Sequence, residues 1–303
     1  MKLIKFHGMG NDYLILADPG WDALDGAPDG ASWRRRVAEI CDRHTGLGGD
    51  GILLPVPAER GAQYGLRIFN PDGTTAEKSG NGLRIFARWL VDARGAPSTF
   101  TVSLPRDVVR CTVSPETIEI EMGTARIAGL SLQDLTMRGD TRMVEHAFAV
   151  DLGNPHCPIF LSSTPWDELP WKEWGRHLEH HPVFPAGTNV QFVQVLNRNR
   201  LSMRIWERGA GWTLASGSSC CAAAACAVRT PRPGTERVEI EGEESEGRCD
   251  PGWITIEMEG GELSVHVPEE GSVTLRGPVE EVGSFRFSRS WLDSRTKEPP
   301  RGD

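Results

Sequence analysis

Two segments of the chain, one in each half, share a pattern in which a serine and a glycine open an apolar stretch. The first segment, residues 79–82, runs into helical periodicity from Leu83 to Leu90. The second, residues 216–219, runs into the alanine-rich stretch from Cys220 to Val228. Both are typical of helix N-termini, where free backbone N–H groups and the positive helix end attract an anion. We therefore expect two opposed helix ends that hold one carboxylate between two reactive side chains.

Strand and helix patterns follow a similar order in both halves. The first half is predicted to have strands at 2–7, 13–17, 51–56, 64–70, 100–104, 108–113 and 117–122, with helices at 33–43 and 80–93. The second half is predicted to have strands at 146–152, 158–161, 190–196, 201–206, 237–241, 253–259, 262–267 and 272–281, with helices at 171–177 and 219–229. This repetition predicts an α/β (α+β) fold of two domains. We assign residues 1–125 with about 268–287 to the first, residues 126–267 to the second, and 288–303 to a polar, frayed tail.

Composition excludes several classes of partner. The formal net charge of −9 argues against a nucleic acid or an anionic membrane surface. No stretch approaches the roughly 20 apolar residues of a membrane span, and the N-terminus lacks the pattern of a signal peptide. The seven cysteines are odd in number and lack paired C-x-x-C spacing, which favours reduced thiols over disulfides or a zinc site. We expect a cytoplasmic protein whose partner is a small molecule.

Short glycine- and asparagine-rich motifs recur in a fixed order along the chain. They lie at residues 6–12, 48–51, 69–73, 79–84, 153–156, 187–190 and 207–211. A single glycine-rich match would be weak evidence, because glycine and asparagine are ordinary turn residues. The ordered set resembles the diaminopimelate epimerase family from about residue 3 to about residue 285.

The resemblance implies a fold of two pseudo-symmetric domains, each a curled mixed sheet around a central helix, with the active site in the interdomain cleft. It implies an isomerase of lysine and peptidoglycan precursor biosynthesis that interconverts L,L- and meso-2,6-diaminopimelate. The family uses no pyridoxal phosphate, so neither a cofactor nor a metal is expected. One cysteine thiolate takes the α-proton while a second thiol delivers a proton to the opposite face. A homodimer is left open.

Site residues follow from the same motifs, residue by residue. The resemblance assigns the acid/base positions to Ser79 and Ser216, which are cysteines in the family. The distal end of the substrate would contact Asn11, Asn70, Asn154, Asn189, Glu207 and Arg208, with Arg208 on the distal carboxylate and Glu207 on the distal ammonium. The reacting α-carboxylate would accept hydrogen bonds around Gly80, Asn81, Gly217 and Ser218. His156 would stand behind these residues and orient its neighbours.

The two serines change the expected chemistry. A cysteine thiol titrates near pH 8.5, whereas a hydroxyl resembles water and is weaker by about seven pKa units, or roughly 10 kcal/mol. A helix end contributes only about 0.3–2 kcal/mol, which cannot close that gap. Serine activation generally needs an adjacent base, and no motif puts a histidine beside either serine in sequence. Cys220 lies one turn into its helix, away from the site.

Several interpretations remain open at this point. The chain is an epimerase scaffold in which both cysteines have been replaced, so that it binds substrate with little or no turnover. Alternatively, it is a divergent natural relative that binds another amino acid or performs different chemistry. A third interpretation is an epimerase activated by an arrangement that the sequence does not reveal. A non-catalytic amino-acid-binding protein on the same scaffold belongs to a different functional class.

Overall fold

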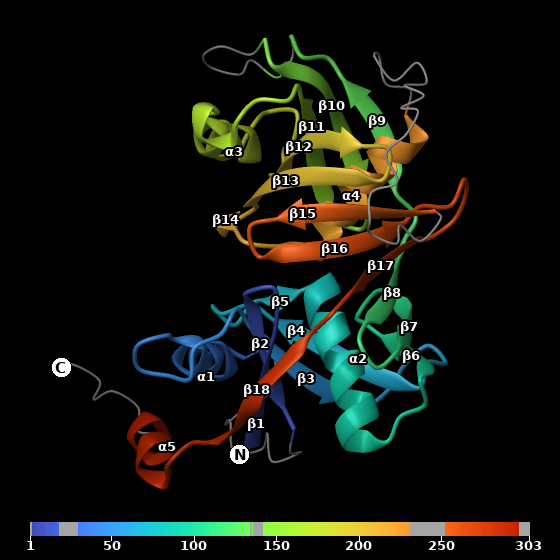
Figure 1. Ribbon diagram of the computed structural model, residues 1–303. Coiled ribbons are helices and arrows are strands. Elements are labelled where there is room, and N and C mark those ends of the chain that lie inside the picture. Colours follow the sequence, from blue (N-terminus) through green and yellow to red (C-terminus); the bar gives the residue numbers. More distant parts are fainter. Residues whose placement is uncertain (1, 18–29, 134, 136–141, 231–251, 297–303) are drawn as a thin grey trace, which may run out of the picture.

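The computed structural model describes residues 2–17, 30–133, 135, 142–230 and 252–296. Figure 1 shows two stacked lobes, each with strands wrapped around one long helix. The central helix of the first lobe is α2 (Gly80–Arg94), and that of the second is α4 (Gly217–Arg229). The predicted mixed α/β fold with two helix-centred halves is therefore confirmed.

The first lobe contains the N-terminal strands and two helices. Its other elements are β1 (Lys2–Gly8), β2 (Asn11–Leu16), α1 (Ala31–Cys41), β3 (Ile52–Val56), β4 (Tyr64–Phe69), β5 (Thr75–Ala76), β6 (Thr99–Ser103), β7 (Val108–Val113) and β8 (Ile118–Gly123). The pairs β2–β3 and β4–β6 are parallel, and each pair is connected through a helix, α1 or α2. Its other strand pairs are antiparallel, such as β6–β7 and β7–β8.

The second lobe repeats this order of elements. It contains β9 (Arg126–Leu130), β10 (Val144–Asp151), β11 (Pro155–Leu161), the 3-10 turn η2 (Trp166–Glu168), α3 (Trp171–Glu179), β12 (Asn189–Asn197), β13 (Arg200–Glu207), β14 (Gly211–Thr213), β15 (Trp253–Met258) and β16 (Gly261–His266). Here β11–β12 and β13–β15 are the parallel pairs, connected through α3 and α4. The short β14 follows β13 just as β5 follows β4. The duplication indicated by the two serine–glycine segments therefore extends to strand order and direction.

The last strands return the chain from the second lobe to the first. Sequence analysis predicts one strand at 272–281, but the structure has two, β17 (Val273–Gly277) and β18 (Glu280–Arg286). The break follows Gly277, whose added Cβ would lie 2.1 Å from the Leu263 side chain, and includes Pro278, which has no N–H to donate. β17 pairs with β16 and β8, whereas β18 pairs with β1. We propose that the domain boundaries fall at residues 125 and 268, around this return.

The chain does not fray immediately after β18. The predicted polar tail begins instead with helix α5 (Arg289–Thr296). The Trp291 ring stacks on Phe287 with 3.8 Å between ring centroids, and its Nε1–H donates to the Thr45 carbonyl at 3.1 Å. The predicted strand at 237–241 and Cys249 lie outside the described residues.

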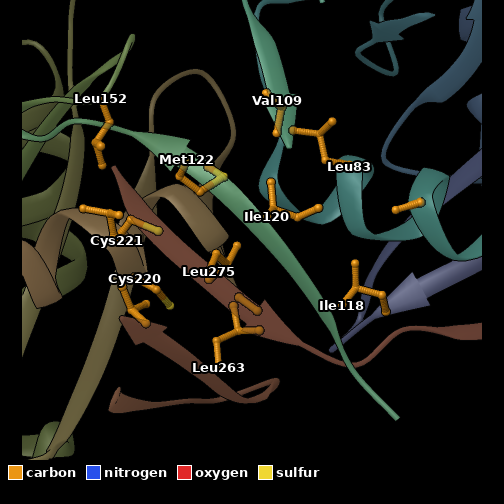
Figure 2. Packing of buried hydrophobic residues seen from close by; sticks show 14 of the residues in the cluster. Leu83, Val109, Ile118, Ile120, Met122, Leu152, Cys220, Cys221, Leu263 and Leu275 are labelled. Atoms are coloured by element: carbon orange, nitrogen blue, oxygen red, sulfur yellow. The ribbon is translucent and has the colours of Figure 1, made fainter. Parts of the chain in front are cut away.

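One apolar core continues from lobe to lobe. Figure 2 shows Leu275 of β17 between Met122, Cys220 and Leu263. All four side chains are no more than 1% exposed, so this strand packs the two lobes together. The six described cysteines are buried and free, as expected for reduced thiols. No helix among the described residues is long and apolar enough to cross a membrane.

Candidate active site

The N-termini of α2 and α4 meet at a pair of glycines. A Cβ added to Gly217 would lie 3.4 Å from the Gly80 Cα and 2.6 Å from a methyl group of Leu275. A Cβ on Gly80 would lie 2.9 Å from the same methyl group. Neither glycine has a positive φ, so close approach is what favours glycine at both positions. The predicted arrangement of two opposed helix ends is therefore present.

A cavity of about 150 Å³ opens at this junction, between residues of both lobes. It is lined by Asn11, Tyr13, Asn70, Ala76, Lys78, Ser79, Gly80, Asn81, Asn154, Asn189, Glu207, Ala215, Ser216, Gly217 and Ser218. Of the residues assigned to the site from the sequence, all but Arg208 and His156 are in this lining. The cavity is smaller than the roughly 300–1,000 Å³ of drug-sized pockets, which favours a small ligand.

Ser79 and Ser216 are the N-cap residues of the two helices, in matching extended conformations. The Ser79 hydroxyl oxygen caps its helix by accepting from the Gly82 N–H at 3.0 Å. It also accepts from the Tyr13 hydroxyl at 3.3 Å. Ser216 makes no such cap with its side chain. Its hydroxyl instead shares the cavity wall with the Glu207 carboxylate and acts to lower the pKa of that group.

Glu207 ends β13 and brings a half-buried carboxylate to the cavity. Burial raises the pKa of this carboxyl above its ordinary value, the hydrogen bond from Ser216 opposes the shift, and the charge of Asp50 adds to it. A carboxylate with a raised pKa is a stronger base than an ordinary glutamate. A cationic group beside this carboxylate would relieve the cost of its desolvation.

Side-chain amides form a chain of hydrogen bonds along the cavity wall, and the donor and acceptor of each bond are defined. Arg84 has only donors and gives one to the Asn81 Oδ1 at 2.9 Å. The Asn81 Nδ2 therefore faces Asn11, donating to its Oδ1 at 2.7 Å and to its carbonyl at 2.8 Å. Asn11 in turn donates to the Asp50 carboxylate at 2.8 Å. The donor-only arginine at one end and the carboxylate at the other set the orientation of both amides.

The guanidinium of Arg84 is wholly buried directly behind the helix ends. Burial lowers its pKa to about 10, so the group keeps its charge at neutral pH. Its Nη1 donates to the Gly80 carbonyl at 3.4 Å. This buried positive charge and the two helix dipoles together favour an anion in the cavity.

Two asparagines of the second lobe also orient local structure. Asn189 donates to the Pro155 carbonyl at 2.9 Å and accepts from the Arg208 backbone N–H at 3.0 Å, which holds the starts of β11 and β12 and the turn after β13 together beside the cavity. It is the first residue of β12, and Asn11 is the first residue of β2, so both amides are held at the start of a strand. Asn154 shares a 3.0 Å hydrogen bond with the His156 ring.

The two predicted site residues outside the lining have different positions. Arg208 is exposed, and its guanidinium donates to the Ala186 carbonyl at 3.2 Å. Its contact with a distal carboxylate stays a proposal that requires the side chain to turn. His156 is fully buried behind Asn154, and its Nδ1 lies 3.1 Å from the Gln191 amide. Because its partners are Asn154 and Gln191, this histidine is not hydrogen-bonded to either serine.

Four lining residues were missed by sequence reasoning: Tyr13, Ala76, Lys78 and Ala215. The Lys78 ammonium is held at the wall by the Met122 carbonyl at 2.8 Å and the Asp107 carboxylate at 2.9 Å. Tyr13 carries the single hydroxyl of the predicted strand at 13–17, whose other residues are aliphatic, and this signal could have identified it. Lys78 and Ala215 each directly precede an N-cap serine. Including the residue before each serine in the motif would have identified both.

The thiol nearest in sequence to Ser216 is not part of the cavity. Cys220 is fully buried, and its Sγ lies 3.4 Å from the Met258 sulfur. Burial raises the pKa of the Cys220 thiol well above its usual range. Cys220 therefore cannot supply a thiolate to the site, in agreement with its predicted position one turn into the helix.

A second cavity, of about 410 Å³, shares Asn11 with the first. Its wall includes the half-exposed Trp212 and the guanidinium of Arg43. Arg43 contacts the carboxylates of both Asp12 and Asp50 at 2.7 Å, so its charge is already compensated. Hydrogen bonds from Arg43 and Lys5 hold the pKa of Asp12 below its ordinary value, although burial acts to raise it. No group of three or more metal-ligating side chains occurs within the part of the chain that the structure describes.

Sequence comparison identifies close relatives of the whole chain. The family model described as diaminopimelate epimerase matches residues 3–128 and 148–282. Diaminopimelate epimerase 2 of Nostoc sp. is 36% identical over 302 residues, covering 95% of this chain and 96% of that protein. The diaminopimelate epimerase of Synechocystis sp. is 33% identical over 300 residues, covering 94% of this chain and 98% of that protein.

Solved structures of more distant proteins share the fold. A predicted epimerase from Pseudomonas aeruginosa superposes with a TM-score of 0.66 at 16% identity, covering 94% of this chain and 98% of that one. A hydroxyproline epimerase from Agrobacterium vitis, solved with trans-4-hydroxy-L-proline, superposes with a TM-score of 0.63 at 15% identity and covers 94% of this chain and 91% of that one. At such identities the similarity concerns the fold alone.

Proposed function

The chain belongs to the diaminopimelate epimerase family, a family of isomerases, and we propose that its cavity binds diaminopimelate but moves the α-proton far more slowly than a two-thiol enzyme would. The observation that carries this proposal is the junction of two helix N-termini at Gly80 and Gly217, with a hydroxyl instead of a thiol at each N-cap. We propose Ser79 and Ser216 as the acid/base positions on the two faces of the α-carbon.

The proposed binding mode follows from the charges around the cavity. The α-carboxylate would lie at the two helix ends, where Gly80, Asn81, Gly217 and Ser218 offer backbone N–H groups and the buried Arg84 adds positive charge. The same charges would stabilise the carbanion that forms when the α-proton leaves. The distal amino-acid end would extend toward Asn70, Asn154, Asn189 and Glu207, which contribute polar groups to the same wall.

The proposed chemistry is slow because neither serine has a strong base as its partner. Ser79 contacts a phenol, which is not a base at neutral pH, and Ser216 contacts a carboxylate. A carboxylate with a raised pKa is still far weaker than the alkoxide that serine would have to become. A binding protein without turnover is the second candidate, favoured by the position of His156, which contacts amides and neither serine.

The proposal is tested first by calorimetric titration with L,L- and meso-diaminopimelate, followed by deuterium exchange at the α-carbon of bound ligand. We expect binding of at least one isomer with little or no exchange. Rapid exchange would show that the hydroxyls, or a neighbour, do remove the proton. Failure of both isomers to bind would overturn the assignment of the ligand.

Glu207→Gln is expected to weaken diaminopimelate binding by about tenfold or more, because the ligand ammonium would lose its charged partner. The variant should not be less stable without ligand. Burial raises the pKa of Glu207, so its ionised form costs stability at neutral pH, and glutamine removes that cost. Affinity of the unmodified protein should fall on acidification at a higher pH than an ordinary carboxylate would give.

Calorimetry from neutral to acidic pH checks this expectation, together with thermal unfolding of the unliganded variant. Glu116→Gln, in an exposed turn, is the matched control and should change neither affinity nor stability. Equal affinity in Glu207→Gln and the unmodified protein would exclude Glu207 from the ammonium site.

A further inference from the structure

Tyr13 brings a buried hydroxyl to the proposed active site. Its side chain is 7% exposed and extends from β2, with the ring in the core shared by the two lobes. The hydroxyl lies in the cavity wall and donates to the Ser79 Oγ at 3.3 Å. Burial raises the pKa of Tyr13 above its ordinary value, so the phenol remains protonated and remains a donor at neutral pH.

The hydrogen bonds that Ser79 already makes decide whether it can donate to a ligand or accept from it. A serine oxygen has two lone pairs and one hydrogen. The Gly82 N–H at 3.0 Å uses one lone pair, and the Tyr13 hydroxyl uses the other. What remains to face a ligand is the hydrogen of Ser79.

The surroundings of Ser216 leave it the role of a hydrogen-bond acceptor toward a ligand. Its hydroxyl lies in the same cavity wall as the Glu207 carboxylate and stabilises the ionised form of that group, which can only accept, so the hydrogen of Ser216 is what Glu207 would engage. Its oxygen does not cap α4, in contrast to Ser79 and α2. The lone pairs of Ser216 therefore remain available to the cavity.

We propose that Tyr13 is a positioning residue that makes Ser79 the hydrogen-bond donor of the cavity, while Glu207 makes Ser216 the acceptor. The two matching N-caps thereby acquire opposite polarity, although their backbones are alike. The inference rests on the proposed function only in taking this cavity as the place of proton transfer. It differs from the family resemblance, which assigned no role to Tyr13.

These opposite hydrogen-bond roles would let a proton leave the ligand on the Ser216 face and another arrive on the Ser79 face. On the Ser216 face, the α-C–H bond would break, its proton would pass to Ser216, and the hydrogen of Ser216 would pass to Glu207. On the opposite face, the carbanion would take the hydrogen of Ser79, which Tyr13 would replace. Glu207 would then be neutral and Tyr13 a phenolate, and each would reset by exchanging one proton with solvent.

The test measures the acidity of a thiol placed at each position and needs no turnover. Ser79→Cys and Ser216→Cys are prepared separately, each with and without Tyr13→Phe, and thiolate absorbance is followed against pH. Because the six described native thiols are buried, the unmodified protein supplies the background. Tyr13→Phe keeps the aromatic ring and removes only the hydroxyl.

We expect the thiol introduced by Ser79→Cys to have the lower pKa, by about one unit or more, because two donors stabilise its thiolate while Glu207 opposes the thiolate at the other position. Tyr13→Phe should raise the pKa of the first thiol by about one unit and leave the second unchanged. Adding Glu207→Gln to Ser216→Cys should lower the pKa of the second thiol. Equal acidity at both positions, or no response to Tyr13→Phe, would overturn the proposal.

Failure of this test and failure of the proposed function are distinguishable. The titrations contain no diaminopimelate, so a lack of ligand binding would leave the polarity intact. Conversely, a failed titration would remove the role of Tyr13 while diaminopimelate binding, measured by calorimetry on the unmodified protein, stood unchanged.

Discussion

Ser79→Cys combined with Ser216→Cys is expected to raise the rate of α-proton exchange in diaminopimelate by about 10³-fold or more. The difference in acidity between a thiol and a hydroxyl is about seven pKa units, or roughly 10 kcal/mol. If about half of that difference reaches the transition state, the barrier falls by about 5 kcal/mol. The existing helix ends and the buried Arg84 would then act on a thiolate, which they stabilise readily.

Each single variant is expected to fall well short of the pair. A proton must leave one face of the α-carbon and arrive on the other, so one thiol still relies on a hydroxyl opposite to it. Deuterium incorporation into separate L,L and meso samples measures each face by itself. Ser218→Cys places a thiol in the same cavity but not at an N-cap, and it is the matched control for an adventitious base.

The native thiols do not obscure this experiment. Cys220 and Cys221 lie in α4 but are fully buried, and burial raises the pKa of Cys221 to about 12. Neither is in the cavity lining. If the double variant binds diaminopimelate but exchanges no faster than the unmodified protein, the assignment of positions 79 and 216 to proton transfer is wrong.

Local patterns identified most elements of the fold because each carried its own signal. The central helices were predicted from a glycine-opened apolar periodicity, and α2 begins at the predicted residue, Gly80. Strand partners were not predictable, because pairing joins residues far apart in the chain. The return of β17 and β18 from one lobe to the other is such a case, and its single predicted strand was wrong.

In the site too, features encoded by neighbouring residues were predictable, whereas contacts between residues far apart in the chain were not. Helix-end glycines and serines are local features, and the structure brings them together. The contact between Tyr13 and Ser79 joins a strand residue to a helix cap 66 positions later, so no local pattern encodes it. The exposure of Arg208 and the burial of His156 likewise depend on how the second lobe packs around them.

His156 is expected to make the fold acid-sensitive in a specific range. The ring is fully buried as the neutral form, with one nitrogen 3.0 Å from the Asn154 Oδ1 and the other 3.1 Å from the Gln191 Nε2. Gln191 donates to the second nitrogen, so a proton added there would face another donor. Burial lowers the pKa of His156 to about 3, and the nearby charge of Arg208 acts in the same direction.

The sign follows from proton binding in the two states. Between about pH 6.5 and pH 3, the unfolded chain binds a proton at His156 that the folded chain does not. Stability is therefore lost as the pH falls through this range and is fully present above it. From pH 7 to pH 4 the loss due to this residue should be about 3 kcal/mol, at about 1.36 kcal/mol for each pKa unit crossed.

Urea unfolding at pH 7 and at pH 4 measures this loss in the unmodified protein and in His156→Gln. The variant is expected to lose about 3 kcal/mol less on acidification, whatever its stability at pH 7. His7→Gln, at a partly exposed histidine beside Glu280, is the matched control and should keep the full loss. Acid-sensitive carboxylates such as Asp12 remain in all three proteins, so their contribution cancels in the comparison. An equal loss in His156→Gln would mean that this ring takes up a proton in the folded state. Gln191, which donates to the second ring nitrogen, would then have to reorient at the same pH.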